Sequence, residues 1–120
     1  MIPAPEYIFP DALPAWHRIT SSLDRRGEWK SKYRILAYMA ATQCAAYCSG
    51  VSIAQQRRKF GLEPHCERDK VTEECRQLAR LMLSDMCYLP LARVPVALLD
   101  AEGHDIDLID ICGPLTEADK

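Results

Sequence analysis

The chain has 120 residues, of which 48% are hydrophobic and 27% are charged, and its net charge is −2. This composition is that of one globular domain, so it excludes a disordered chain, and no apolar run reaches the length of a membrane span. We therefore expect a single domain over residues 1–120, located in the cytoplasm and without a membrane partner. Six cysteines fit a reducing compartment, because a chain of this length can build a core without disulfides.

The first half of the chain is predicted to form an extended arm followed by two helices. Three prolines predict an extended apolar arm over residues 1–10, which packs on its own domain or docks on a partner. Apolar residues at helical spacing predict a first helix over about 12–26, ended by Gly27. A second helix is expected from residue 28 or 29 to about Cys48. It is apolar on nearly every side beyond residue 37, so we expect it at the centre of the fold.

The middle of the chain is expected to hold a break and two further helices. Ser49 and Gly50 predict the break, and Ser52 is a suitable cap for a short third helix that ends near Gly61. A fourth helix is predicted from about Cys66 to Tyr88, because apolar residues recur there every three or four positions.

In the last third of the chain, the spacing of the apolar residues changes from a helical to an alternating pattern. Apolar residues alternate over 94–100 and 105–111, and residues 101–103 suit a hairpin loop with glycine in the left-handed position. The register would place Leu98 opposite Ile106. The predicted fold is therefore α+β: three main helices and a short one, with a C-terminal antiparallel β-hairpin and a loose tail over 113–120.

The charges are separated along the chain and indicate candidate contact surfaces. Residues 15–66 carry a net charge of +6 and residues 100–120 a net charge of −6. Aromatic side chains surrounded by cations are typical of interface hot spots, and the acidic face of the hairpin would suit a basic partner. Alternatives are packing between the first two helices and simple solvation. The predicted partner-binding residues are Arg25, Arg26, Trp29, Lys30, Tyr33, Arg34, Asp105 and Asp107.

A second interpretation is a helix-turn-helix that reads DNA. Ala46 stands four residues before Gly50, Val51 follows the glycine, and a basic segment comes next, as in the turn of such motifs. The nucleic-acid-binding residues would then be Arg57, Arg58 and Lys59. Ser49 and Gln56 depart from this pattern because buried apolar residues are usual at their positions, and a helical corner with solvated cations is the simpler alternative.

Zinc binding and catalysis have weaker support. A zinc site would draw on Cys44, Cys48, His65, Cys66 and Cys75, yet the sequence has no second paired cysteine knuckle. No cysteine has a histidine in a local catalytic signature, and the acids near residue 105 lack the order of a calcium loop. We therefore assign no catalytic residue, metal ligand or cofactor.

The function expected from the sequence is that of a small non-enzymatic regulator. It would be an adaptor, an inhibitor or an accessory subunit that occupies the surface of a partner protein. A DNA-binding regulator is the alternative, and a small zinc-binding protein comes third. The sequence leaves open the identity of the partner and the oligomeric state.

Overall fold

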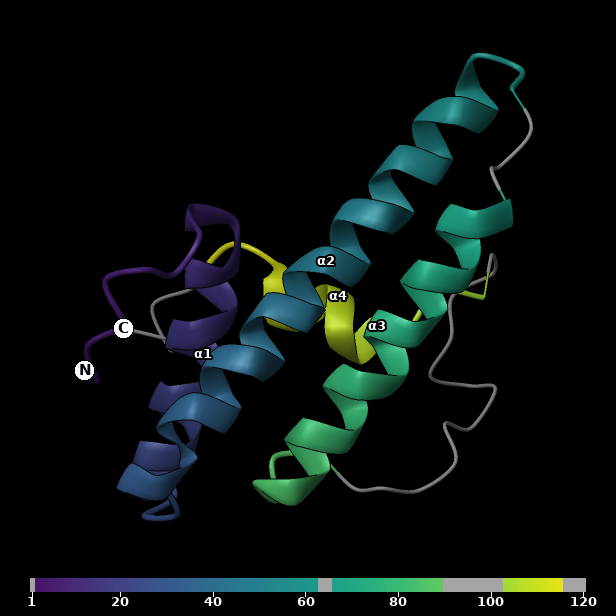
Figure 1. Cartoon of the computed structure of the whole chain (residues 1–120). Helices are drawn as coiled ribbons and strands as arrows, with labels where there is room; N and C mark the ends of the chain where they lie inside the picture. Colours follow the sequence, from purple (N-terminus) through teal and green to yellow (C-terminus); the bar gives the residue numbers. More distant parts are fainter. Residues whose placement is uncertain (1, 63–65, 90–102, 116–120) are drawn as a thin grey trace.

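The computed structural model describes residues 2–62, 66–89 and 103–115, and in these residues the chain is mainly helical (Figure 1). Its elements in chain order are the 3₁₀-helix η1 (Pro10–Ala12), α1 (Leu13–Arg25), the 3₁₀-helix η2 (Ser31–Tyr33), α2 (Arg34–Lys59), α3 (Cys66–Asp85) and α4 (Ile106–Cys112).

Helix α2 is the centre of the arrangement, as the sequence predicts. It contacts α1, α3 and α4, and α3 runs antiparallel beside it along much of its length (Figure 1). The core combines α1 residues such as Trp16 and Ile19 with small residues of α2, including Ala40 and Cys44. Small side chains on α2 let its neighbours approach closely, so the larger side chains of α1, α3 and α4 fill the space between the helices.

The predicted β-hairpin is wrong. Its second strand, residues 105–111, is the N-cap and body of α4, and no strand occurs in the described parts of the chain. The alternating acids and apolar residues also fit a helix, because Leu108 and Ile111 stand three positions apart and are both buried. The first predicted strand, residues 94–100, lies outside the described residues.

The predicted break at Ser49 and Gly50 is also wrong, because α2 continues without a turn to Lys59. Gly50 instead lies at a tight contact between α2 and α3. A Cβ atom at this position would overlap Oγ1 of Thr72 and lie 3.1 Å from its Cγ2. The glycine therefore serves helix packing rather than a turn, and the helix-turn-helix interpretation loses its geometric basis.

Three helix ends share one type of C-terminal cap. After α1, α2 and α3 the chain passes through a left-handed residue, namely Gly27, Gly61 and Cys87. In each case a following backbone N–H returns to a carbonyl of the last turn, as with the Tyr88 N–H and the Leu83 oxygen at 2.8 Å. This cap ends α3 at Asp85, three residues before the predicted end.

The N-terminal arm lies on its own domain. Trp16 Nε1 donates to the Ile2 carbonyl at 3.2 Å, and the Tyr7 ring meets the Tyr38 ring edge-on at 5.0 Å. Tyr7 and Phe9 nevertheless remain exposed. Among the helices that the structure describes, none is both long enough and apolar enough to cross a bilayer.

Candidate functional site

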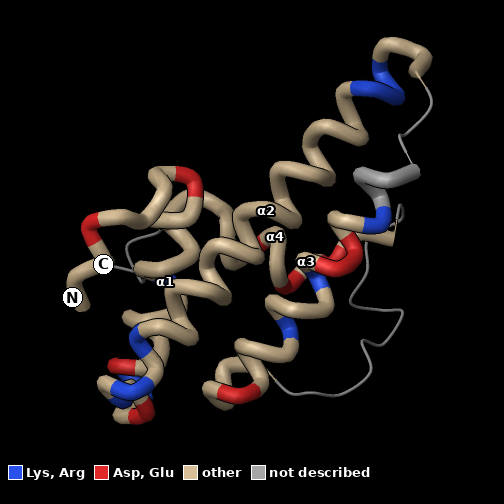
Figure 2. Tube along the Cα trace, in the orientation of Figure 1, with Lys and Arg blue, Asp and Glu red and all other residues tan. Residues whose placement is uncertain are grey.

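The side of α2 that faces away from the core carries no charge. Residues 35–56 contain no acidic or basic side chain, and Figure 2 shows this long stretch without either colour between its basic ends. Ile35 is 69% exposed and Met39 is 42% exposed. The outward stripe follows a 4-3-4-3-4 spacing and consists of Ile35, Met39, Thr42, Ala46, Ser49 and Ile53, all exposed or half-buried.

Helix α3 continues this surface beside α2. Val71 is 56% exposed and Leu78 is 43% exposed, and with the half-buried Cys75 they follow a 4-3 spacing. Leu81, 48% exposed, stands at the edge of the stripe. Arg76 and Arg80 extend toward α4, so the stripe points away from that helix. We call the two stripes together the outer face.

A solvated helix face in a globular protein normally carries charged residues, because they cover the helix at no cost in desolvation. The outer face instead exposes large apolar side chains on two neighbouring helices. Apolar side chains scattered singly over a surface are ordinary, but a contiguous patch marks a contact site. The geometry therefore suits contact with another apolar protein surface.

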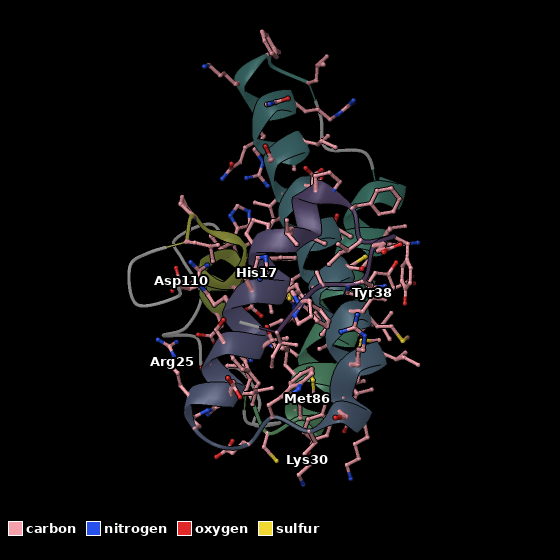
Figure 3. All side chains as sticks on the ribbon, turned by 90° about the vertical axis from the view of Figure 1, so that its left-hand side faces the viewer. His17, Arg25, Lys30, Tyr38, Met86 and Asp110 are labelled. Atoms are coloured by element: carbon pink, nitrogen blue, oxygen red, sulfur yellow. The ribbon has the colours of Figure 1, made fainter. Side chains whose placement is uncertain are left out.

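A second surface, the basic corner, lies where α1 ends and α2 begins. Five cations gather there, namely Arg25, Arg26, Lys30, Lys32 and Arg34, and all are exposed. Figure 3 places Arg25 and Lys30 on the outside of this end of the molecule. Glu28 lies 3.8 Å from Arg26 and is the single acid within residues 25–34, so the segment has a net charge of +4.

Aromatic rings hold the basic corner in place. Trp29 meets Trp16 of the core edge-on at 6.2 Å and Tyr33 at 6.4 Å, and the backbone N–H of Trp29 donates to the Leu23 carbonyl. Lys30 and Lys32 lie 5.6 and 5.8 Å from the centre of the Tyr33 ring. The corner thus joins six of the predicted partner-binding residues. Its two aromatics are half-buried in internal packing, and the cations form its accessible part.

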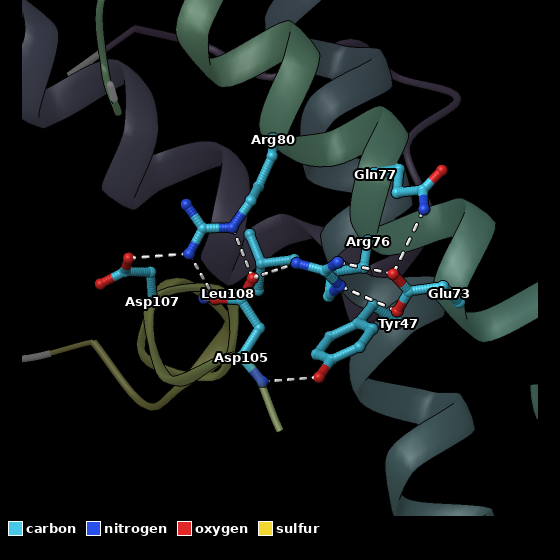
Figure 4. A network of polar contacts seen from close by, with 8 residues as sticks. All are labelled: Tyr47, Glu73, Arg76, Gln77, Arg80, Asp105, Asp107 and Leu108. Carbon is cyan, nitrogen blue, oxygen red and sulfur yellow. Dashed lines mark hydrogen bonds and ion pairs between the residues drawn. The ribbon is translucent and has the colours of Figure 1, made fainter. Parts of the chain in front are cut away.

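Asp105 and Asp107 lie elsewhere, in a polar network between α3 and α4 (Figure 4). Asp105 is completely buried and accepts hydrogen bonds from Nε and Nη2 of Arg80 at 2.5 and 2.8 Å. Arg76 adds a longer contact at 3.4 Å, and Arg80 also reaches Asp107 at 2.9 Å. The expectation of an exposed acidic strand face is therefore wrong, since arginines of the same chain already neutralise these carboxylates.

The same network orients its neighbours. The Asp105 side chain accepts from the backbone N–H of Leu108 as the N-cap of α4, and the Asp105 N–H donates to Tyr47 Oη at 2.7 Å. Arg76 also donates to Glu73 at 2.9 and 2.5 Å, and these hydrogen bonds lower the pKa of Glu73. The network joins α2, α3 and α4 and has a structural role.

Arg18 holds the opposite end of α4. Its guanidinium donates to four backbone carbonyls at and beyond the last turn, those of Asp110, Ile111, Gly113 and Pro114. A cation at the C-terminus of a helix is favourable because the last carbonyls have no partner within the helix. Arginines of α1 and α3 thus fix both ends of α4.

Three thiols meet between α2 and α4. Cys112 is hydrogen-bonded to Cys44 and Cys48, and the Cys48 thiol also donates to the Leu108 carbonyl at 3.5 Å. The hydrogen bond with Cys44 raises the pKa of Cys112 to about 12, and that with Cys112 raises the pKa of Cys48. Neutral thiols are weak nucleophiles, so this cluster favours packing over reaction.

The predicted zinc residues are not assembled in the described part of the chain. Cys44 and Cys48 meet Cys112, which the predicted set does not include, and His65 lies outside the described residues. The five cysteines whose side chains the structure describes are free thiols. Among the described residues, no group of three or more His, Cys, Asp or Glu side chains is arranged so that it could hold a metal ion.

The predicted nucleic-acid-binding residues lie in the last turn of α2. Arg57, Arg58 and Lys59 follow Val51, the last buried residue of this helix. Cations are favourable at a helix C-terminus, so their position has an explanation within the helix.

No protein-family model, curated protein or solved structure matches the chain. Sequence reasoning identified the basic corner but missed the outer face. A signal for the outer face was present, because the absence of charge over residues 35–56 is more than one buried helix side requires.

Proposed function

We propose that the chain is a small non-enzymatic regulator that acts by occupying the surface of a partner protein. The outer face makes the contact, and the basic corner at the start of α2 adds charge to one end of it. We also propose that the protein works in the cytoplasm, where its thiols stay reduced.

The exposed apolar surface of α2 and α3 is the observation that carries this proposal. Ile35, Val71 and Leu78 are 43–69% exposed although the same helices bury a separate set of core residues. Each apolar side chain that leaves water on binding contributes about 1.5–3 kcal/mol when it is fully buried. A few such residues at the centre of an interface supply most of its affinity.

Because the basic corner is positively charged, we expect the partner to carry an acidic region next to the apolar contact. Its cations are exposed, and the rings of Trp29 and Tyr33 hold the segment in a fixed position. Exposed charges of this kind change the association rate and the choice of partner more than the affinity.

The test uses the full chain as bait for proteins of its native cell, followed by reconstitution with purified components. We expect Leu78→Glu to weaken binding at least about tenfold, because it places a charge in the apolar contact. The matched control is Phe9→Glu, which makes the same kind of change at an exposed apolar residue of the N-terminal arm; Phe9 is 67% exposed and Leu78 43%. A double reversal, Lys30→Glu with Lys32→Glu, should slow association and reduce its dependence on salt.

Three results would contradict the proposal. One is a bound protein whose affinity is the same for Leu78→Glu and for the wild type. Another is equal loss of binding with Phe9→Glu, which would show that the bait rather than the outer face was affected. The third is salt-sensitive retention of nucleic acid through Arg57 and Arg58, with no protein bound to the outer face.

A further inference from the structure

We infer that the occupant of the outer face is a second copy of this chain, related by a twofold axis parallel to α2 and α3. In this arrangement α2 of each copy lies over α3 of the other, and the four helices form an antiparallel bundle. The inference rests on the proposed function, since it names the protein that the outer face binds.

The two stripes of the outer face differ in size and fit each other. The middle of the α2 stripe is formed by the small side chains of Thr42, Ala46 and Ser49, whereas the α3 stripe presents Val71 and Leu78. Large side chains of one helix pack best into the spaces left by small side chains of another. The α3 stripe of one copy therefore suits the α2 stripe of the second.

The register between α2 and α3 within one chain places these residues at matching heights. Gly50 lies beside Thr72, and the two helices are antiparallel, so Leu78 is level with residue 44 and Val71 with residue 51. A twofold axis parallel to the helices keeps every residue at its height. Leu78 would then lie between Thr42 and Ala46 of the second copy, and Val71 between Ser49 and Ile53.

Charge favours the same pairing. The exposed Asp85 would come close to the height of the basic corner of the second copy, where Lys30 and Lys32 are exposed. Two α2 helices packed antiparallel on each other would instead bring Arg57 of one copy to the height of Lys30 and Lys32 of the other. They would also place small side chains against small ones. Like charges and unfilled space both weaken an interface, so we discard that pairing.

The test is sedimentation of the full chain with a reducing agent over a wide concentration range. We expect a species of twice the 13.6 kDa chain mass. Leu78→Glu should shift it to monomer by at least about tenfold in dissociation constant, and Phe9→Glu should not. Circular dichroism of each variant verifies that the helices are retained.

The most discriminating variant is Ala46→Phe, at an exposed position where a larger side chain meets no core. It adds apolar surface but fills the space that Leu78 of the second copy would occupy. The inference predicts weaker dimerisation, whereas a merely sticky face predicts stronger association. Unchanged or stronger association of Ala46→Phe overturns the inference.

A wild-type monomer at the highest concentration also overturns it. If the monomer still binds another protein, and Leu78→Glu abolishes that binding, the outer face contacts a different partner and the proposed function stands. A monomer that binds no protein removes both the inference and the proposed function.

Discussion

Two sides of helix α3 differ in the residues that they carry: one has charged residues in internal contacts, and the other has apolar residues exposed to solvent. On the side toward α4, Arg76 and Arg80 bind the buried carboxylate of Asp105. On the outer side, Val71 and Leu78 face solvent. Charged residues thus hold the chain together internally, while apolar residues remain on the surface.

The two sides of α3 differ in whether their side chains have partners within the same chain. Every oxygen of the Asp105 side chain has a donor in the same chain, so no external molecule is needed there. The outer face has no such internal partners for its apolar side chains. A surface that is finished internally serves stability, and one that leaves apolar groups in water is available for binding.

The largest effect is expected from Asp105→Ala, which tests whether the inner side is structural. The change removes the fully buried carboxylate that binds the largely buried Arg80, which keeps the partly exposed Asp107 as a partner, and it also removes the N-cap of α4. We expect a loss of about 3–5 kcal/mol in the free energy of unfolding, measured by urea denaturation.

The matched control is Asp107→Asn, because the Asp107 side chain binds the same arginine but is 30% exposed. This variant should lose less than about 1 kcal/mol. Equal losses for the two variants, or a loss for Asp105→Ala below about 1 kcal/mol, would show that the buried carboxylate does not hold α4 in place.

A smaller effect is expected at Gly50, where the contact between α2 and α3 sets the register of the outer face. Gly50→Ala should destabilise the protein by about 1–3 kcal/mol despite the better helix propensity of alanine, because both branches of Thr72 obstruct the new methyl group. Thermal unfolding measures this loss. Adding Thr72→Ala should recover most of it, whereas additive losses in the double variant would contradict the contact.

Some of the fold could be predicted from the sequence because helical periodicity is a local property. The spacing of Trp16, Ile19 and Leu23 predicts α1, and the Gly27 cap falls where expected. The predicted break at Gly50 is wrong because glycine suits a turn and a close helix contact equally well. Only the neighbouring side chain, Thr72 of α3, distinguishes the two.

The prediction of a β-hairpin is wrong for a related reason. The acids and apolar residues of 105–111 fit both a strand and one side of a short helix. The decision depends on Arg80 and Arg18, which are distant in sequence and fix the two ends of α4. The basic corner was predictable because its residues are consecutive, whereas the outer face depends on pairing two separate helices.

The thiol cluster offers a further contrast with the outer face, since Cys44, Cys48 and Cys112 are satisfied within the chain. The hydrogen bond with Cys44 raises the pKa of Cys112 to about 12, and burial raises the pKa of Tyr47. An unfolded cysteine ionises near pH 8.5 by comparison. Above that pH the unfolded chain releases a proton that folded Cys112 retains, so the folded state loses stability as the pH rises.

We therefore expect the free energy of unfolding to fall by up to about 1.4 kcal/mol per pH unit for each such thiol between about pH 8.5 and 12. Urea denaturation measures this slope at about pH 8, 9 and 10, which span the ordinary cysteine pKa of about 8.5. Cys112→Ser should flatten it, because serine does not ionise in this range, and Cys48 and Tyr47 account for what remains. The control is Cys87→Ser, which makes the same substitution at an exposed cysteine outside the cluster. A slope that Cys112→Ser does not alter would mean that the thiol contact between α2 and α4 contributes nothing to the alkaline limit of the fold.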